Sequence, residues 1–211
     1  MAHLHTLGAA AQAIASANAI LVQTGAGMGV DSGLPDFRGP EGFWKAYPPL
    51  KHLGLRFEEM ANPRHFGTEP NLAWGFYGHR LHLYRETRPH DGFGILREFA
   101  EDKEFFAFTS NIDGHLQSSG FEEDRVYEVH GSLHWLQCVT PCCRDIWSAT
   151  NQRVVVDMAR CLARDPLPHC ARCGGLARPN VLMFGDWGFL SDRSERQADR
   201  FVEWMAERTI E

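Results

Sequence analysis

A pair of cysteines near residue 170 has the spacing of a metal-binding half-site. In Cys170-Ala171-Arg172-Cys173-Gly174 a tight turn lets two thiolates bind one ion, and the glycine relieves crowding. Cys138 forms a second half-site with either Cys142 or Cys143, at slightly wider spacing, and we prefer Cys142. The alternative is six unrelated cysteines, and Cys161, on an apolar stretch expected to be helical, is predicted to lie in the core. Four thiolates leave no position for water, so we predict a structural zinc ion bound by Cys138, Cys142, Cys170 and Cys173.

A glycine-rich turn follows the first apolar run of the chain. Ala19 to Gln23 predicts a short buried strand that continues into Gly25-Ala26-Gly27. Glycines in this position let backbone N–H groups approach a pyrophosphate closely. The third glycine of a G-x-G-x-x-G motif would fall at Val30, and no acidic residue ends a second strand about 20 residues later. Taken alone, these residues predict only a glycine turn after a strand.

Polar side chains follow two further predicted strands. Glu104 to Phe108 is followed by Thr109-Ser110-Asn111-Ile112-Asp113, and Val126 to Val129 is followed by His130. Strands that alternate with helical segments indicate a parallel sheet, in which ligands bind at the carboxyl ends of the strands. We therefore expect these polar groups to face one crevice.

His130 is the candidate for proton transfer because it follows a strand at this expected ligand edge. The chain has 11 histidines, so a single one is more often a surface or core residue. His134, four residues later, raises the alternative of a histidine metal pair. Helical spacing of the two is not assured, since the residues before His130 predict a strand.

Four segments, in order, resemble the motifs of the sirtuin family. Gly25 to Gly39 resembles its cofactor-binding loop, in which G-A-G is followed by S-G-I-P-D-F-R. Thr109 to Gly114 resembles its T-Q-N-I-D element, and Val129 to Gly131 resembles its catalytic H-G. Pro179 to Asp186 resembles its P-x-V-V-x-F-G-E segment. Together these segments span most of the chain.

The resemblance implies NAD as cofactor, with two departures from the family pattern. Gly29 replaces a serine, and Ser110 replaces the glutamine of T-Q-N-I-D, which shortens or removes a contact to the ribose. The residues implied to bind NAD are Gly25, Ala26, Gly27, Asp36, Phe37, Arg38, Ser110, Asn111 and Asp113.

The implied activity is removal of acyl groups from protein lysines. In the family's reaction the acyl carbonyl oxygen attacks the ribose C1′ as nicotinamide leaves, with His130, Asn111 and Asp113 as the implied catalytic residues. His130 would take a proton from the ribose hydroxyls, and the products would be lysine, nicotinamide and 2′-O-acyl-ADP-ribose. Two alternatives remain: an NAD glycohydrolase or ADP-ribosyltransferase, and a non-catalytic module that binds NAD or protein.

The acyl group and the peptide have separate candidate residues. Tyr77 and Arg80 lie three apart on one face of a predicted helix, and they resemble the Y-x-x-R pair by which one sirtuin branch binds succinyl or malonyl groups. The alternative is an ordinary amphipathic helix with Arg80 facing water. The peptide backbone is expected to add as a strand beside the segment that contains Val181 and Phe184.

The candidate site residues and the strands before them predict an α/β fold, with a Rossmann-like parallel sheet, helices on both faces and a small zinc-binding module. We assign residues 1–132 and 179–211 to the Rossmann-like NAD-binding domain and 133–178 to an inserted zinc-ribbon module. Residues 40–100 are expected to form a helical region for cofactor and substrate loops. The local pattern also predicts an alanine-rich helix at Ala9–Ala17, an amphipathic helix at Asp91–Ala100, a strand at Pro179–Phe184 and a closing helix at Asp192–Arg208 with Asp192 as N-cap. Sirtuin catalytic domains continue into further strands and a loop that binds adenosine, so a sequence ending at Glu211 is either a fragment or a shortened relative.

Composition agrees with an ordinary globular protein. Hydrophobic residues make up 44% of the 211 residues, and no run approaches the roughly 18 apolar residues of a membrane span. The net charge of −6 has no basic concentration, so we expect neither nucleic acid nor membrane as a partner. We expect a cytoplasmic protein whose partner is an acyl-lysine protein or peptide, and we make no prediction of its oligomeric state.

Overall fold

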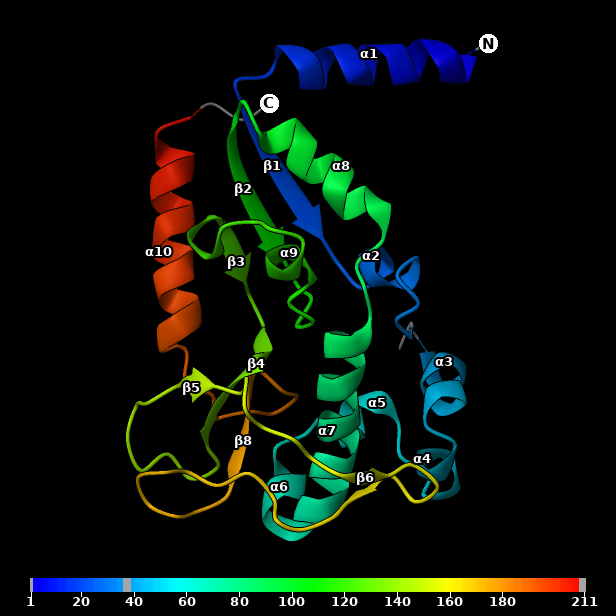
Figure 1. The fold of residues 1–211 in the computed structure, drawn as a ribbon, viewed down its shortest axis with the longest axis vertical. Coiled ribbons are helices and arrows are strands. Elements are labelled where there is room, and N and C mark those ends of the chain that lie inside the picture. Colours follow the sequence, from blue (N-terminus) through cyan, green and yellow to red (C-terminus); the bar gives the residue numbers. More distant parts are fainter. Residues whose placement is uncertain (1, 36–38, 209–211) are drawn as a thin grey trace.

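Three parallel strands form the predicted sheet. The computed structural model describes residues 2–35 and 39–208 of the chain (Figure 1). The strands, in spatial order, are β1 (Ala19–Thr24), β2 (Glu104–Thr109) and β3 (Val126–Glu128). Thr24 pairs with Thr109, and Thr109 pairs with Glu128. Because the strands end level with one another, the loops that follow them leave the sheet at the same edge.

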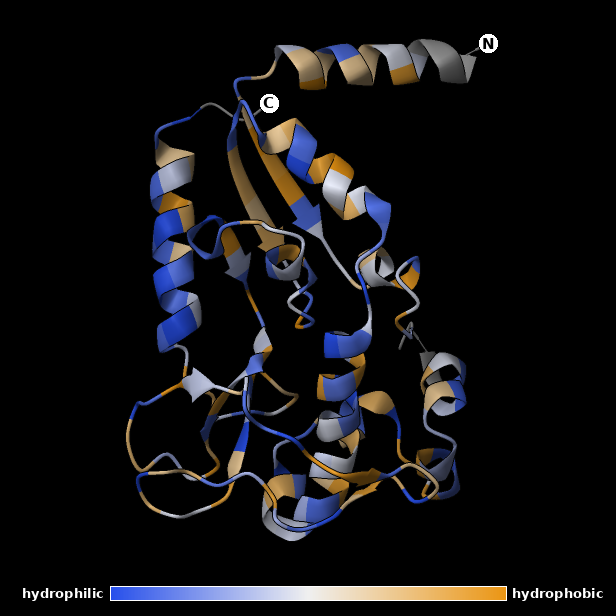
Figure 2. Ribbon diagram, viewed as in Figure 1, coloured by the Kyte–Doolittle hydropathy of each residue, from blue (hydrophilic) through white to orange (hydrophobic). Residues whose placement is uncertain are grey.

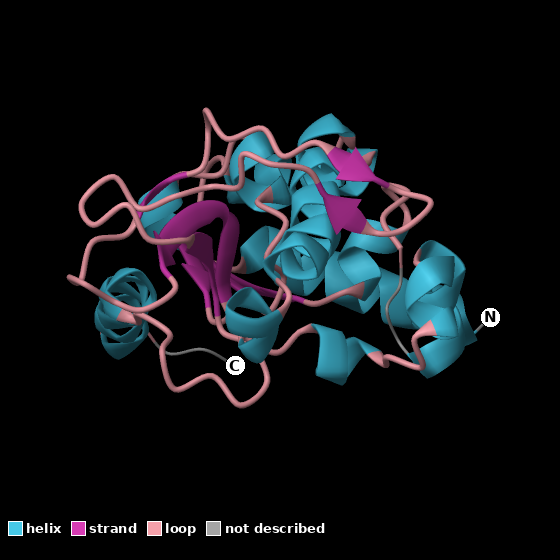
Figure 3. Ribbon diagram, turned by 90° about the horizontal axis from the view of Figure 1, so that it is seen from below, coloured by secondary structure: helices cyan, strands magenta, loops and turns pink. Residues whose placement is uncertain are grey.

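Helices cover both faces of this sheet. The elements around it are α8 (Asp91–Ala100), α9 (His115–Ser118), the 3₁₀ helix η1 (Glu123–Arg125) and α10 (Asp192–Ala206). Neighbouring side chains of a strand point to opposite faces. Phe105 accordingly joins a cluster with Phe93 of α8, whereas Phe106 packs against Phe201 of α10. Figure 3 shows helices on both sides of the strands, and Figure 2 shows hydrophobic β1 and β2 beside the largely hydrophilic α10.

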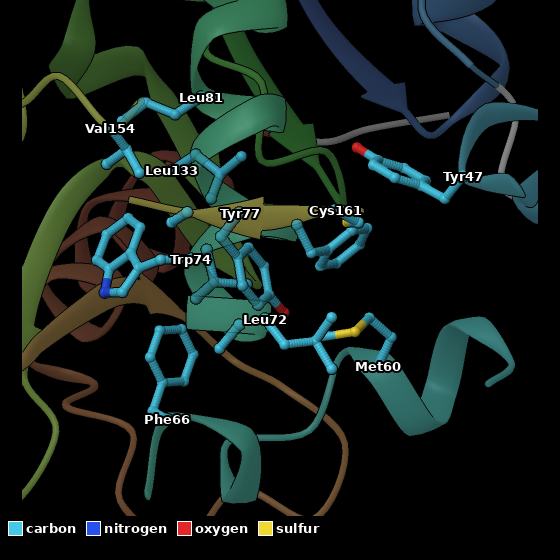
Figure 4. Close-up of a cluster of buried hydrophobic side chains, with 14 of the residues drawn as sticks. Tyr47, Met60, Phe66, Leu72, Trp74, Tyr77, Leu81, Leu133, Val154 and Cys161 are labelled. Atoms are coloured by element: carbon cyan, nitrogen blue, oxygen red, sulfur yellow. The ribbon is translucent and has the colours of Figure 1, made fainter. Parts of the chain in front are cut away.

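The region expected to be helical packs around one long buried helix. It contains α3 (Gly39–Ala46), α4 (Pro48–His52), α5 (Phe57–Met60), α6 (Arg64–Thr68) and α7 (Pro70–Glu86). Trp74 and Tyr77 of α7 are at the centre of the larger hydrophobic core (Figure 4). A Cβ at Gly75 would clash with the carbonyl oxygen of Cys161, so the cysteine-rich segment packs directly against the backbone of α7.

The segment that follows the parallel strands forms a second sheet. Its order is β5-β4-β8, from β4 (Gly131–Cys138), β5 (Trp147–Ser148) and β8 (Ala177–Val181), beside a small pair of β6 (Val156–Asp157) and β7 (Leu162–Ala163). β8 was expected at Pro179–Phe184, and it pairs antiparallel with β4 instead of extending the parallel sheet. The boundaries expected for the inserted module, at 133 and 178, therefore fall inside paired strands.

Two local predictions were wrong in detail. Cys161 is fully buried as expected, but it lies in a turn with φ 54° and not in a helix. The N-cap of α10 is Ser191, not Asp192, whose carboxylate instead accepts a hydrogen bond from Arg144 at 2.8 Å. The contact between Asp192 and Arg144 is a tertiary contact that local propensity does not describe.

Helix α1 (Ala2–Ser16) extends away from the sheet at the top of Figure 1. Its second half matches the helix predicted from the alanine-rich sequence. The Lys103 ammonium group donates hydrogen bonds to the carbonyl oxygens of Ala15 and Ala17, which fixes the C-terminal end of the helix to the sheet. Over the described residues, no helix combines the length and apolar character that crossing a membrane requires.

Candidate functional site: a cavity at the carboxyl edge of the sheet

A cavity of about 510 Å³ lies where the parallel sheet, α7 and the segment after β8 meet. It brings together predicted residues from all four family-like segments and from α7. Those that line it are Ala26, Tyr77, Arg80, Ser110, Asn111, Asp113, His130, Val181 and Phe184. Asp36, Phe37 and Arg38 lie outside the described residues. The cavity also has apolar walls that the sequence did not single out, among them Leu34, Phe57, Ile112 and Met183.

Hydrogen bonds between strand ends fix the polar side of the cavity. The hydroxyl groups of Thr24 and Thr109 lie 2.7 Å apart across the β1–β2 pair. The Ser110 amide donates to the Thr24 carbonyl oxygen at 3.2 Å. Asn111 donates from Nδ2 to the carbonyl oxygen of Gly25 at 2.9 Å, and its own amide donates to Thr109 Oγ1 at 3.0 Å. Asn111 therefore joins the end of β2 to the glycine turn that follows β1.

The glycine turn leads into the short helix α2 (Gly27–Val30). Gly25, Ala26 and Gly27 donate no backbone hydrogen bond to any acceptor among the described residues. A Cβ on Gly25 would come within 3.4 Å of the Ser110 hydroxyl oxygen, so the turn passes close to the end of β2. Free amides on a close-lying backbone are the arrangement that binds phosphate oxygens.

His130 follows β3 and is exposed on the cavity wall. Its Nδ1 lies 3.1 Å from the Ser110 carbonyl oxygen. A carbonyl oxygen only accepts hydrogen bonds, so Nδ1 is the donor in this bond, and Nε2 is the nitrogen that carries the lone pair when the ring is neutral. Gly131 has φ 72°, and a Cβ there would clash with the Asn180 carbonyl oxygen. The glycine after His130 thus permits the chain to turn from β3 into the β4–β8 pair.

His134 supports Asp113, and its Nε2 is engaged there and not free for a metal pair with His130. It lies on strand β4, and its Nε2 donates to the Asp113 carbonyl oxygen at 2.8 Å. The Asp113 carboxylate accepts a hydrogen bond from the His115 amide at 2.9 Å. These two bonds fix the backbone and the side chain of Asp113 where it lines the cavity.

The α7 side of the cavity contains a buried cation among phenol groups. Arg80 is 5% exposed and Tyr77 is 1% exposed, so the alternative that Arg80 faces water was wrong. Arg80 Nε donates to the hydroxyl oxygen of Tyr84 at 3.0 Å. Burial raises the pKa of Tyr77 and of Tyr84, so both phenols stay protonated and able to donate. Tyr84 was missed by sequence reasoning, although its position four residues after Arg80 placed it on the same helix face.

The four predicted cysteines form one cluster away from this cavity. Their sulfur atoms all lie within 4.8 Å of one another, with Cys138 and Cys173 at 3.6 Å and Cys142 and Cys170 at 3.8 Å. Ligands at about 2.3 Å from zinc would have sulfurs roughly 3.8 Å apart, so the set fits a tetrahedral zinc ion. Backbone amides of Cys173 and Arg172 lower the pKa of Cys170 to about 7, which favours the thiolate that zinc requires.

Comparison with known proteins places these features in one family. Residues 25–201 match the model of the Sir2 family. The NAD-dependent protein deacylase of Aquifex aeolicus is 34% identical over 168 residues, and that of Thermococcus kodakarensis is 33% identical over 181 residues. These alignments cover 79% and 85% of this chain, and the chain spans 62% and 65% of those two proteins. A solved Sir2 homologue in complex with NAD superposes with a TM-score of 0.65 at 29% identity, over 90% of this chain and 67% of that one.

Proposed function

The chain belongs to the Sir2 family, and we propose from this that it removes acyl groups from lysine side chains of proteins, with NAD as co-substrate. One observation supports the proposal above the others. Ala26 of the glycine turn after β1, the fixed side chains after β2 and the imidazole after β3 all border the same cavity. A glycine turn alone, or a lone histidine, would not bring phosphate-binding and proton-accepting groups together.

The residues present fit NAD. The free amides of Gly25, Ala26 and Gly27 suit its pyrophosphate, and Asn111 and Asp113 suit its ribose and carboxamide. When bound, NAD supplies an electrophilic ribose carbon, with nicotinamide as the leaving group. Ser110 is short, and its hydroxyl points back toward the Thr24 carbonyl oxygen at 3.5 Å.

His130 acts as the general base in this proposal. Its Nδ1–H is held by the Ser110 carbonyl oxygen, which orients the ring and leaves Nε2 to accept a proton from a ribose hydroxyl. Asn111 is held by Gly25, and Asp113 by His115 and His134, so neither must reorganise when a ligand enters. Such preorganisation is the main way in which a protein site lowers a reaction barrier.

The acyl group is proposed to carry a carboxylate, as in succinyl or malonyl lysine. Tyr77 and Arg80 both line the cavity, and both are buried. A guanidinium group binds a carboxylate through a fork of donors, and a protonated phenol adds one further donor. Tyr84, which also lines the cavity, accepts a hydrogen bond from Arg80 and so restricts the orientation of the guanidinium group.

The cysteine cluster is proposed to hold a structural zinc ion. None of the four sulfurs borders the cavity among the described residues. Zinc at this site would stabilise the turns between β4 and β8 and would take no part in proton transfer.

The proposal is tested by supplying NAD and a succinyl-lysine peptide and following the products by mass spectrometry. We expect 2′-O-succinyl-ADP-ribose, nicotinamide and free lysine peptide in equal amounts. ADP-ribose formed equally well without peptide would establish an NAD glycohydrolase instead. NAD binding without any turnover would establish a binding module.

A further inference from the structure

We propose that Trp187 selects substrates by binding a large apolar side chain that flanks the acyl-lysine, an inference that rests on the deacylase function proposed above. Trp187 is 98% exposed. It follows the segment that forms one wall of the cavity, where Leu182 and Phe184 are 43% and 49% exposed. Leu182 and Phe184 line the cavity and are also exposed to solvent, so together with Trp187 they form an apolar surface at its edge that a peptide with its acyl-lysine in the cavity can contact.

The turn that carries Trp187 is anchored by the buried carboxylate of Asp186, the residue before it in the chain. Asp186 accepts a hydrogen bond from Arg178 at 2.7 Å, and the two side chains are 0% and 1% exposed. The same carboxylate accepts from the Met183 amide at 3.3 Å and from the Gly188 amide at 3.1 Å. The residues on both sides of Trp187 are thereby joined to one buried ion pair.

Gln137 anchors the residues that follow Trp187 in the chain. Its Nε2 donates to the Gly188 carbonyl oxygen at 2.7 Å, and its Oε1 accepts from the Leu190 amide at 3.0 Å. Asn180 then donates to the Leu190 carbonyl oxygen at 2.9 Å. Trp187 is thus displayed on a turn whose neighbours are fixed, although its own side chain is almost wholly in water.

The backbone beside Trp187 is available to a peptide. The amides of Leu182, Met183 and Phe184 already donate to His130, to Asp186 and to Ala61. By contrast, the amides of residues 185–187 donate to no acceptor among the described residues. The unpaired backbone donors of this segment are therefore those of residues 185–187, next to the indole, where a bound peptide could accept from them.

Local charge favours an apolar occupant. The negative charge of Asp186 is paired with Arg178 in the interior, so the turn presents no net charge to a ligand. Phe184 and Leu182 extend the apolar surface toward the cavity. Tryptophan is over-represented among the residues that dominate binding interfaces, because a rigid ring buries a large area with little loss of entropy.

The test compares peptides that share one succinyl-lysine and differ at a single flanking position, from two residues before it to two after. Each position carries alanine, phenylalanine or lysine in turn. Steady-state kcat and KM are measured for the unchanged protein, for Trp187→Ala and for the control Phe99→Ala. Phe99 is an exposed aromatic residue of α8, outside the cavity.

At one position we expect phenylalanine to lower KM by roughly 3- to 10-fold relative to alanine, a range set by the area that one aromatic ring buries. This preference should persist in Phe99→Ala and vanish in Trp187→Ala, with kcat and the melting temperature unchanged. Equal KM values for alanine and phenylalanine at every position, a preference for lysine, or a preference retained in Trp187→Ala would overturn the inference.

Failure of the deacylase function is distinguishable from failure of this inference. If no peptide is turned over, the proposed function fails, and peptide affinity is then measured by calorimetry without NAD. A phenylalanine preference in binding that Trp187→Ala removes would still support the role of Trp187. Equal binding of all peptides to both proteins would overturn it.

Discussion

The side-chain amide of Asn111 donates to the carbonyl oxygen of Gly25 at 2.9 Å, and this bond joins the ends of two neighbouring parallel strands. It sets the separation between the glycine turn, whose amides are free, and the polar residues after β2. A ligand that contacts both loops therefore meets a gap whose width is fixed before binding.

Asn111→Ala should weaken NAD binding roughly 3- to 10-fold, the range expected when one net hydrogen bond that positions a site is lost. Isothermal titration calorimetry with NAD measures this directly. Asn71→Ala is the matched control, since Asn71 Nδ2 also donates to a backbone carbonyl oxygen, that of Ala163, but does not line the cavity. Equal NAD affinity in both variants would show that the Asn111 bond does not shape the site.

Arg80→Met should reduce the preference for succinyl over acetyl peptide by roughly 10-fold or more, because hydrogen bonds to charged groups exceed neutral ones in strength. Tyr84→Phe, which removes the acceptor that orients Arg80, should reduce it less. The quantity to measure is the ratio of kcat/KM for the two peptides. Arg85→Met serves as a control, as Arg85 donates to the carbonyl oxygens of Ala149 and Gln152, the only acceptors it has among the described residues, and does not line the cavity. An unchanged ratio in Arg80→Met would mean that the acyl carboxylate lies elsewhere.

Cys173→Ala should abolish zinc binding and lower the melting temperature by more than about 5 °C, because the energy of a structural zinc ion contributes to folding. Cys143→Ala should keep one zinc per chain, since Cys142 and not Cys143 belongs to the four-sulfur cluster. Metal analysis and thermal unfolding of both variants test this pair of expectations. Zinc retained in Cys173→Ala, or lost in Cys143→Ala, would require a different ligand set.

Asp186→Ala should destabilise the fold by about 3–5 kcal/mol, because it leaves the Arg178 guanidinium buried without its partner charge. The double variant Arg178→Met with Asp186→Ala should recover a large part of this loss, since no unpaired charge then remains. Urea unfolding of the three proteins gives the free energies. A loss below about 1 kcal/mol in Asp186→Ala would show that Arg178 finds other solvation.

The local sequence pattern was enough to predict the strands that form the parallel sheet and the helices that pack beside it. Helix α8 begins and ends where its amphipathic period predicts, and β2 alternates between two apolar faces. The pairing of β8 with β4 was not predictable, because the sequence of a short strand carries no information about its partner.

In the candidate site, too, some features were predictable from the sequence and others depend on tertiary contacts. Segment order placed Asn111 and His130 at one edge because parallel strands end together. The burial of Arg80 was not visible in the sequence, since it depends on aromatic residues brought to α7 from other segments. The role of His134 was also hidden, because its partner is a backbone oxygen 21 residues earlier.

The central claim is that His130 Nε2 removes a proton during acyl transfer, and the rate of 2′-O-acyl-ADP-ribose formation by His130→Asn tests it most directly. We expect this rate to fall roughly 10²- to 10⁴-fold, the usual contribution of a general base, while the melting temperature and the affinity for NAD stay unchanged. An unchanged rate in well-folded His130→Asn that still binds NAD would contradict the account.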